Sequence, residues 1–152
     1  MSGATLAGAL GGVELARTAE ASIGQASRPP NLTRMDGLNF AIEAARIAAD
    51  SHAEEVVVLD LRGISSIADF FVIGTGTSDR QMNAVIDQIE DFGRKVGQKP
   101  LGYSGRESDT WVLADYVDVV VHMFSPEKRR YYDLELLWGD APRIEWQRAA
   151  TA

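Results

Sequence analysis

The run Gly74-Thr75-Gly76-Thr77-Ser78 is the part of this sequence whose composition most resembles a ligand-binding loop. It follows an apolar segment and precedes a helical pattern, and unsatisfied backbone N–H groups at a helix start can hold a phosphate. The run lacks the lysine of a P-loop and does not match the GxGxxG dinucleotide pattern. A tight turn whose glycines allow positive φ and whose Ser78 caps the next helix accounts for the same residues and is the favoured interpretation.

Acidic side chains at Asp60, Asp69, Asp115 and Asp118 invite a search for a metal site or an acid/base pair. Asp115 and Asp118 are three residues apart, so they would lie on opposite faces of one strand or on either side of a turn. His122 has no further ligand or nucleophile at a recognisable spacing. The sequence therefore predicts no catalytic residue, no metal site and no cofactor.

A segment with binding rather than chemical character spans Trp111 to Tyr116. Its residues, Trp111-Val112-Leu113-Ala114-Asp115-Tyr116, combine a large aromatic ring, aliphatic side chains and an acid within one strand and its turn. Such mixtures are common at protein-binding hot spots. The same tryptophan could equally belong to the core, so its burial decides between the two interpretations.

Composition and charge limit the class of protein. The chain has 152 residues, 45% of them hydrophobic, and no cysteine, which fits one cytoplasmic domain without disulfides or thiol chemistry. No apolar run approaches the roughly 18 residues that a membrane span needs. The net charge is −7, from 22 acidic and 15 basic side chains, so we expect no membrane and no sequence-specific nucleic-acid partner. A basic protein is a more suitable binding partner for an acidic chain.

Hydrophobic periodicity predicts helices and strands in alternation. A first helix should begin near Thr33, followed by a stripe at Met35, Leu38, Ile42, Ala45 and Ala49. Strands are expected over 55–61, buried on both faces, and over 69–73. A second helix should start at Ser78 and run to Gly97 with an apolar stripe comprising Met82, Val85, Ile86, Ile89 and Phe92. Strands over 111–115 and 117–124 should form a hairpin that turns at residues 116–118.

The final helix has the clearest start signal. Ser125-Pro126-Glu127 provides an N-cap, a proline in the first turn and an acid near the helix start, and the helix should carry Arg129 to Trp138. Arg129 could pair with Asp133 one turn later. The whole order predicts an α/β (α+β) fold, a single domain with a mixed β-sheet flanked by helices.

Composition also suggests where the domain begins and ends. Residues 1–32 are rich in Ala, Gly and Ser and end in two prolines, which is typical of a flexible N-terminal tail. We therefore expect the folded domain over residues 33–146 and a short C-terminal tail over 147–152.

Five motifs in order resemble the ribosomal silencing factor family, also called the Iojap family, over residues 35–142. The motifs are Asp60-Leu-Arg-Gly63, Asp69-Phe-Phe-Val-Ile-Gly-Thr-Gly-Thr-Ser78, Trp111-Val-Leu-Ala-Asp-Tyr116, Asp118-Val-Val-Val-His122 and Tyr132-Asp-Leu-Glu-Leu-Leu-Trp138.

The resemblance implies a nucleotidyltransferase-like topology without enzyme activity. It implies a protein that binds the large ribosomal subunit through large-subunit ribosomal protein fourteen, blocks association of the two subunits, and so represses translation during starvation. A homodimer is also possible by this resemblance. Carried over motif by motif, the ribosomal-protein-binding residues would be Trp111, Val112, Leu113, Asp115, Tyr116, Asp118 and His122. A nucleotidyltransferase-like enzyme using the Gly74–Ser78 turn, and a homodimeric scaffold with another partner, are the alternatives.

Two positions depart from the family pattern. The family usually has Glu-Gly where this chain has Ser104-Gly105, and a glycine in the hairpin turn where this chain has Val117. We expect Val117 to force a different turn, because a β-branched residue resists positive φ.

Overall fold

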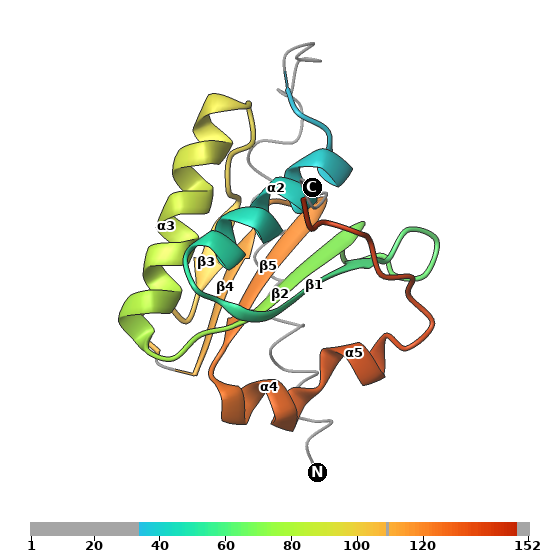
Figure 1. The fold of residues 1–152 in the computed structure, drawn as a ribbon. Helices are drawn as coiled ribbons and strands as arrows, with labels where there is room; N and C mark the ends of the chain where they lie inside the picture. Colours follow the sequence, from blue (N-terminus) through green and yellow to red (C-terminus); the bar gives the residue numbers. More distant parts are fainter. Residues whose placement is uncertain (1–33, 109, 149–152) are drawn as a thin grey trace.

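The computed structural model describes residues 34–108 and 110–148 (Figure 1). The tail expected at residues 1–32 lies outside this part. The elements follow one another as α2 (Gly37–Asp50), β1 (Glu54–Asp60), β2 (Phe70–Thr75), α3 (Asp79–Lys95), β3 (Gly102–Ser104), β4 (Trp111–Asp115), β5 (Val119–Phe124), α4 (Pro126–Tyr132) and α5 (Leu134–Leu137). None of the helices in the described part is long and apolar enough to cross a membrane.

The strands form one five-stranded sheet in the order β1-β2-β5-β4-β3. β2 and β5 are parallel at its centre, and the other neighbouring pairs are antiparallel. The predicted mixed sheet with flanking helices is therefore confirmed, as is the hairpin of β4 and β5. The three-residue edge strand β3 was not predicted, because so short a strand has too few residues to display an alternating pattern.

The sheet separates two hydrophobic clusters. α2 and α3 pack on the face that carries Val119 and Val121, whereas Leu134, Tyr132 and other residues of the chain's last third pack on the opposite face. Figure 1 shows α2 and α3 together along the sheet, and α4 and α5 gathered at the sheet end where β5 finishes. Two long helices, α2 and α3, thus cover one face of the sheet, and two short helices, α4 and α5, lie at the other.

α2 differs in detail from the expected first helix. Its N-cap is Asp36, whose side chain accepts a hydrogen bond from Asn39 N–H, so the helix begins after Met35 rather than near Thr33. The buried face is also rotated relative to the predicted stripe and consists of Phe40, Ala41, Ala44, Ala45 and Ala48. Small alanines let the helix backbone approach the sheet closely, which a stripe defined by larger apolar residues does not reveal.

α3 follows the prediction closely. Ser78 caps it by accepting a hydrogen bond from Gln81 N–H, and the buried side chains are four of the five expected, Met82, Val85, Ile86 and Ile89. The fifth, Phe92, is half-buried against the same cluster. The chain leaves the helix through Gly97, which has a φ of +78°.

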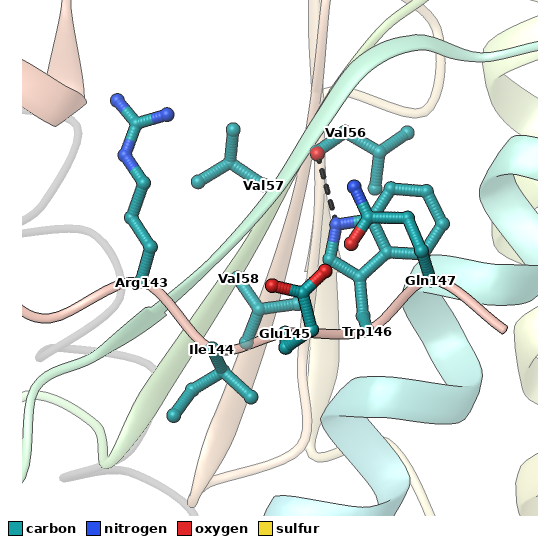
Figure 2. Close-up of a pocket in the computed structure, with 8 residues that line it drawn as sticks. All are labelled: Val56, Val57, Val58, Arg143, Ile144, Glu145, Trp146 and Gln147. Carbon is teal, nitrogen blue, oxygen red and sulfur yellow. Dashed lines mark hydrogen bonds between the residues drawn. The ribbon is translucent and has the colours of Figure 1, made fainter. Parts of the chain in front are cut away.

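β1 lies at the edge of the sheet, and its second half packs on both faces as predicted: Val58 belongs to one hydrophobic cluster and Leu59 to the other. Val58 and Leu59 are buried, but Glu54 and Glu55 are exposed. The segment after α5 runs alongside β1 and forms hydrogen bonds with it: Ile144 N–H donates to Val58 at 2.9 Å and the Trp146 indole donates to the Val56 carbonyl at 3.1 Å (Figure 2). We call residues 142–146 the C-terminal strap.

The predicted single last helix is divided at Asp133. This residue has a φ of +45°, ends α4, and caps α5 by accepting a hydrogen bond from Leu136 N–H. An aspartate tolerates the left-handed region better than most residues, because its short carboxylate bonds to nearby backbone. The expected pair of Arg129 with Asp133 is therefore replaced by a pair of Arg129 with Glu135.

Candidate functional site

Two backbone amides of the Gly74–Ser78 turn donate to groups of neighbouring elements. Gly76 N–H donates to the Phe124 carbonyl at 2.8 Å and Thr77 N–H donates to the Gln81 side chain at 2.6 Å. Gln81 N–H in turn donates to Ser78 Oγ at 3.1 Å. A Cβ atom at Gly76 would lie 2.3 Å from Met82 Cγ, so glycine is required for packing here. These contacts support the turn-and-cap interpretation and leave little support for a phosphate-binding loop.

The acidic residues do not come together as a metal site. Asp115 is 3% exposed, and its carboxylate accepts a hydrogen bond from Val117 N–H at 2.8 Å. Asp118 lies in the turn beyond it, with a half-exposed side chain 3.9 Å from the Arg34 guanidinium. Among residues 34–108 and 110–148, no group of three or more His, Asp or Glu side chains could hold a metal ion.

Most of the residues expected to contact a partner are buried. Val112, Tyr116 and His122 are fully buried, and Leu113 and Asp115 are nearly so. The physical reason is that β4 and β5 are internal strands whose alternate side chains enter the two hydrophobic clusters. Of the seven expected residues, only the two remaining ones, Trp111 and Asp118, keep part of their surface exposed. The five buried side chains are divided between the two faces of the sheet, and a direct contact by them with a partner stays a prediction.

Trp111 belongs partly to the core and partly to the surface. Its indole N–H donates to His122 Nδ1 at 3.1 Å, and its ring lies 4.7 Å from the Phe124 ring and 4.6 Å from the Tyr132 ring, between centroids. Because Nδ1 accepts this bond, neutral His122 carries its proton on Nε2. Burial, with a smaller effect of the Arg129 charge, lowers the pKa of His122 to about 3. The histidine is therefore a neutral structural partner of the tryptophan.

An exposed apolar surface lies on the helices next to this aromatic group. Tyr131 is 48% exposed, Leu136 77% and Leu137 50%. We call these three residues the α4–α5 patch. Its Tyr131 is connected to Trp111 through Tyr132, whose ring lies 5.0 Å from the Tyr131 ring. Isolated exposed leucines are ordinary, but adjacent ones beside aromatic residues are typical of binding surfaces.

The sequence reasoning missed Leu136 and Leu137 because it treated the last helix as one continuous packing element. A signal was present in the spacing of Leu134, Leu136 and Leu137. Residues two apart on a helix lie on nearly opposite sides, so Leu134 and Leu136 cannot both face the core. Leu134 is buried, which leaves Leu136 exposed.

Comparison with known proteins then gives the family. A family model described as "Ribosomal silencing factor during starvation" matches residues 35–152. The chain belongs to the ribosomal silencing factor family.

Individual relatives of this chain include a bacterial and a plant protein. Ribosomal silencing factor RsfS of Halalkalibacterium halodurans is 44% identical, over 67% of this chain and 87% of its own length. The chloroplastic protein Iojap of Zea mays is 35% identical, over 71% of this chain and 47% of its own length. These relatives carry the names of silencing factors or Iojap proteins, and neither is named as an enzyme.

Solved structures share the fold of this chain. A crystal structure of a Chromobacterium violaceum protein has a TM-score of 0.66 and 31% identity, and the match covers 76% of this chain and 96% of that one. A Bacillus halodurans structure has a TM-score of 0.58 and 39% identity, with 71% and 95% covered. The architecture described above is therefore that of known folded relatives.

The two departures of this chain from the family pattern have different structural settings. Ser104 is exposed on the edge strand β3, whereas a Cβ at Gly105 would lie 2.1 Å from the Trp111 carbonyl, so the glycine of the pair is the constrained residue. Val117 has a φ of +75°, and Asp118 N–H donates to the Tyr116 carbonyl at 3.0 Å. This is a γ-turn centred on valine. Val117 thus adopts a positive φ despite its β-branched side chain, because the hydrogen bonds around the turn hold it there; that this turn differs from the family's stays a prediction.

Proposed function

We propose that this chain is a silencing factor that binds the large ribosomal subunit through large-subunit ribosomal protein fourteen and prevents the small subunit from joining. Translation would thereby be repressed in the cytoplasm when nutrients are scarce. The observation that carries this proposal is the exposed α4–α5 patch beside half-buried Trp111, in a chain of the ribosomal silencing factor family.

The patch has the character of a protein-binding centre. Tyr131, Leu136 and Leu137 offer apolar area, and aromatic residues with short aliphatic neighbours contribute most where water is excluded. A charged side chain borders the patch, since Lys128 lies over the Tyr131 ring at 4.9 Å. An apolar centre with a charged border is the usual arrangement of such an interface. Of the strand residues expected to bind, from Trp111 to His122, Trp111 would reach a partner at this patch. Asp118 lies at the other end of β5 and would need a separate contact.

Silencing by this route needs no chemistry. A domain of about 110 residues is roughly 27 Å across, which is enough to block an intersubunit contact by occupying it. The net charge of −7 suits a basic ribosomal protein, mainly by speeding their encounter. A homodimer through the same apolar patch is the second candidate state, because one self-complementary patch suffices for a two-fold interface. In that state the patch would be unavailable to the ribosome.

Co-sedimentation with isolated large subunits tests the proposal. Leu136→Asp places a charge in the centre of the patch and should abolish co-sedimentation, because burying an unpaired carboxylate is costly. Ile64→Asp is the matched control: Ile64 is 42% exposed and lies in the loop between β1 and β2, at the opposite end of β2 from α4. That variant should sediment with large subunits like the wild type.

A subunit-joining assay tests the consequence of binding. Saturating wild-type protein should prevent small and large subunits from forming complete ribosomes, and Leu136→Asp should not. Full subunit joining in the presence of saturating wild-type protein would contradict silencing. Normal co-sedimentation of Leu136→Asp would instead contradict only the choice of surface.

A further inference from the structure

We propose that Arg129 is a positioning residue: it fixes α5 against the sheet so that Leu136 and Leu137 are presented together with Trp111. This inference rests on the proposed function, since it concerns the same surface. Arg129 is 6% exposed, although arginine is seldom buried without a specific role. It lies on α4, while the groups that it contacts come from α5, β1 and β2.

The guanidinium donates four hydrogen bonds from its planar group. Nε and Nη2 donate to the two carboxylate oxygens of Glu135 at 2.9 and 3.0 Å, which is a bidentate pair. Nη1 donates to Thr75 Oγ1 at 2.9 Å, and Nη2 also donates to the Glu55 carbonyl at 2.7 Å. Such a fork sets direction as well as distance, and a lysine cannot reproduce it. Glu135 immediately precedes the two patch leucines.

The backbone of β1 carries an independent sign of the same arrangement. Glu55 has a φ of +50°, and the pairing register of β1 with β2 shifts between Glu54 and Val57. A bulge of this kind redirects a backbone group that would otherwise continue the strand pairing. Here the redirected carbonyl meets Arg129, so a strained exposed glutamate is explained by the buried guanidinium.

α5 also packs on the sheet through Leu134 and through Trp138, which directly follows it and lies beside the Phe71 ring, but such apolar contacts are not directional. It has four residues, of which only Leu134 is buried, and Asp133 separates it from α4. Glu135 has a second cationic neighbour in Arg143, but their atoms are 3.9 Å apart and Arg143 is largely exposed. The Arg129–Glu135 pair is therefore the specific contact that sets the angle of α5 relative to the sheet.

Two conservative variants test this role. Arg129→Lys keeps the charge and removes the fork, and Glu135→Gln keeps the shape and removes the charge. The matched control is Ile89→Val, which lightens a fully buried position on α3, on the other side of the sheet. Amide hydrogen exchange and affinity for isolated large subunits are measured for each, at a temperature where circular dichroism shows the protein folded.

We call the Arg129–Glu135 pair the clamp. In both clamp variants we expect the amides of residues 133–141 to exchange faster than in the wild type, with α3 much less affected. Both should bind large subunits roughly tenfold more weakly. The double variant should bind large subunits no more weakly than the weaker-binding single variant does, because both substitutions act on the same Arg129–Glu135 pair. Ile89→Val should leave affinity unchanged. If Arg129→Lys does not fold, Glu135→Gln alone decides the outcome.

Wild-type affinity in Glu135→Gln, or equal losses in the clamp variants and Ile89→Val, would overturn the positioning role. The proposed function fails separately: wild-type protein would then show no binding to large subunits at all. Loss of binding in Leu136→Asp together with full binding in Arg129→Lys would retain the function and reject only the role of Arg129.

Discussion

At the level of single residues, the hydrogen bond from the Trp111 indole to His122 links a surface residue to a fully buried one. The imidazole must stay neutral to accept that bond on Nδ1, and burial keeps its pKa near 3. The protonation state of this one side chain is thus tied to the conformation of the tryptophan next to the α4–α5 patch.

Stability should therefore depend on pH through His122. In the unfolded chain the imidazole takes up a proton below about pH 6.5, whereas the folded form, with a pKa of about 3, stays neutral. The free energy of unfolding should then fall as pH is lowered, by about 1 to 2 kcal/mol between pH 6.5 and 5 from this group. Urea unfolding at the two pH values measures it.

His122→Asn keeps an acceptor near the Nδ1 position and should remove this pH-dependent part. His52→Asn, at an exposed histidine with a φ of +70°, should retain it, because asparagine tolerates that conformation. An equal loss of stability between pH 6.5 and 5 in the His122→Asn and wild-type proteins would show that another group is responsible.

The turn residue Val117 leads to a second prediction. A side chain at a φ of +75° costs about 1 to 2 kcal/mol, whereas glycine costs about 0.5 to 1 kcal/mol in backbone entropy. Val117→Gly should thus be as stable as the wild type or up to about 1 kcal/mol more stable in urea unfolding. Val117→Ala retains the strain and loses side-chain contacts, so it should be less stable than Val117→Gly. The reverse order would exclude strain at this turn.

At the level of elements, the C-terminal strap replaces a sixth strand at the β1 edge. Ile144 N–H bonds to the Val58 carbonyl and Asp60 N–H bonds to the Pro142 carbonyl, at 2.9 and 2.8 Å. Arg46 on α2 donates to the Trp146 carbonyl at 2.7 Å and so fastens the strap to a helix as well. An exposed edge strand can pair with other chains, and this cover removes much of that opportunity.

Proline substitution tests the strap. Ile144→Pro removes the N–H that bonds to Val58, together with a half-buried side chain, and should lower the free energy of unfolding by about 2 to 3 kcal/mol. Glu145→Pro, at the exposed neighbouring residue, is the control and should cost clearly less. Differential scanning calorimetry of both variants gives the comparison; equal melting temperatures would mean that the strap pairing contributes little.

The elements also show where sequence patterns succeed. α3 and the β4–β5 hairpin were predicted because their apolar residues repeat with one clear period. The division of the last helix into α4 and α5 at Asp133 was not predicted, because it depends on the left-handed conformation of Asp133 and on the pairing of Arg129 with Glu135. Of the residues at the α4–α5 patch and beside it, only Trp111 was predicted from the sequence, because exposure depends on how the elements pack. A strand motif shows which residues are unusual, but burial of Val112 and His122 depends on what packs over them.

At the level of the whole molecule, charge and apolar surface have separate roles in the proposed encounter. The acidic net charge acts at a distance and is screened by salt, whereas the α4–α5 patch acts only on contact. Association with the purified basic ribosomal protein should slow by roughly tenfold between about 0.05 and 0.5 M salt, with a smaller change in dissociation.

Stopped-flow fluorescence can separate these two contributions. Leu136→Ala removes contact area without changing charge, so it should speed dissociation and leave the salt dependence of association unaltered. An association rate that does not respond to salt would indicate that the net charge of −7 has no part in the encounter.

The strap has a further consequence for the order in which the molecule forms. β1 is among the first parts of the domain to be synthesised, and its outer edge is covered by residues 142–146, which follow every strand and helix described here. During translation the edge therefore stays open until nearly the whole domain has emerged. Nascent chains on one messenger are close together, and an open edge can pair with its neighbour. We expect a protein shortened before Pro142 to form aggregates during synthesis, which sedimentation of the cell-free translation product would reveal.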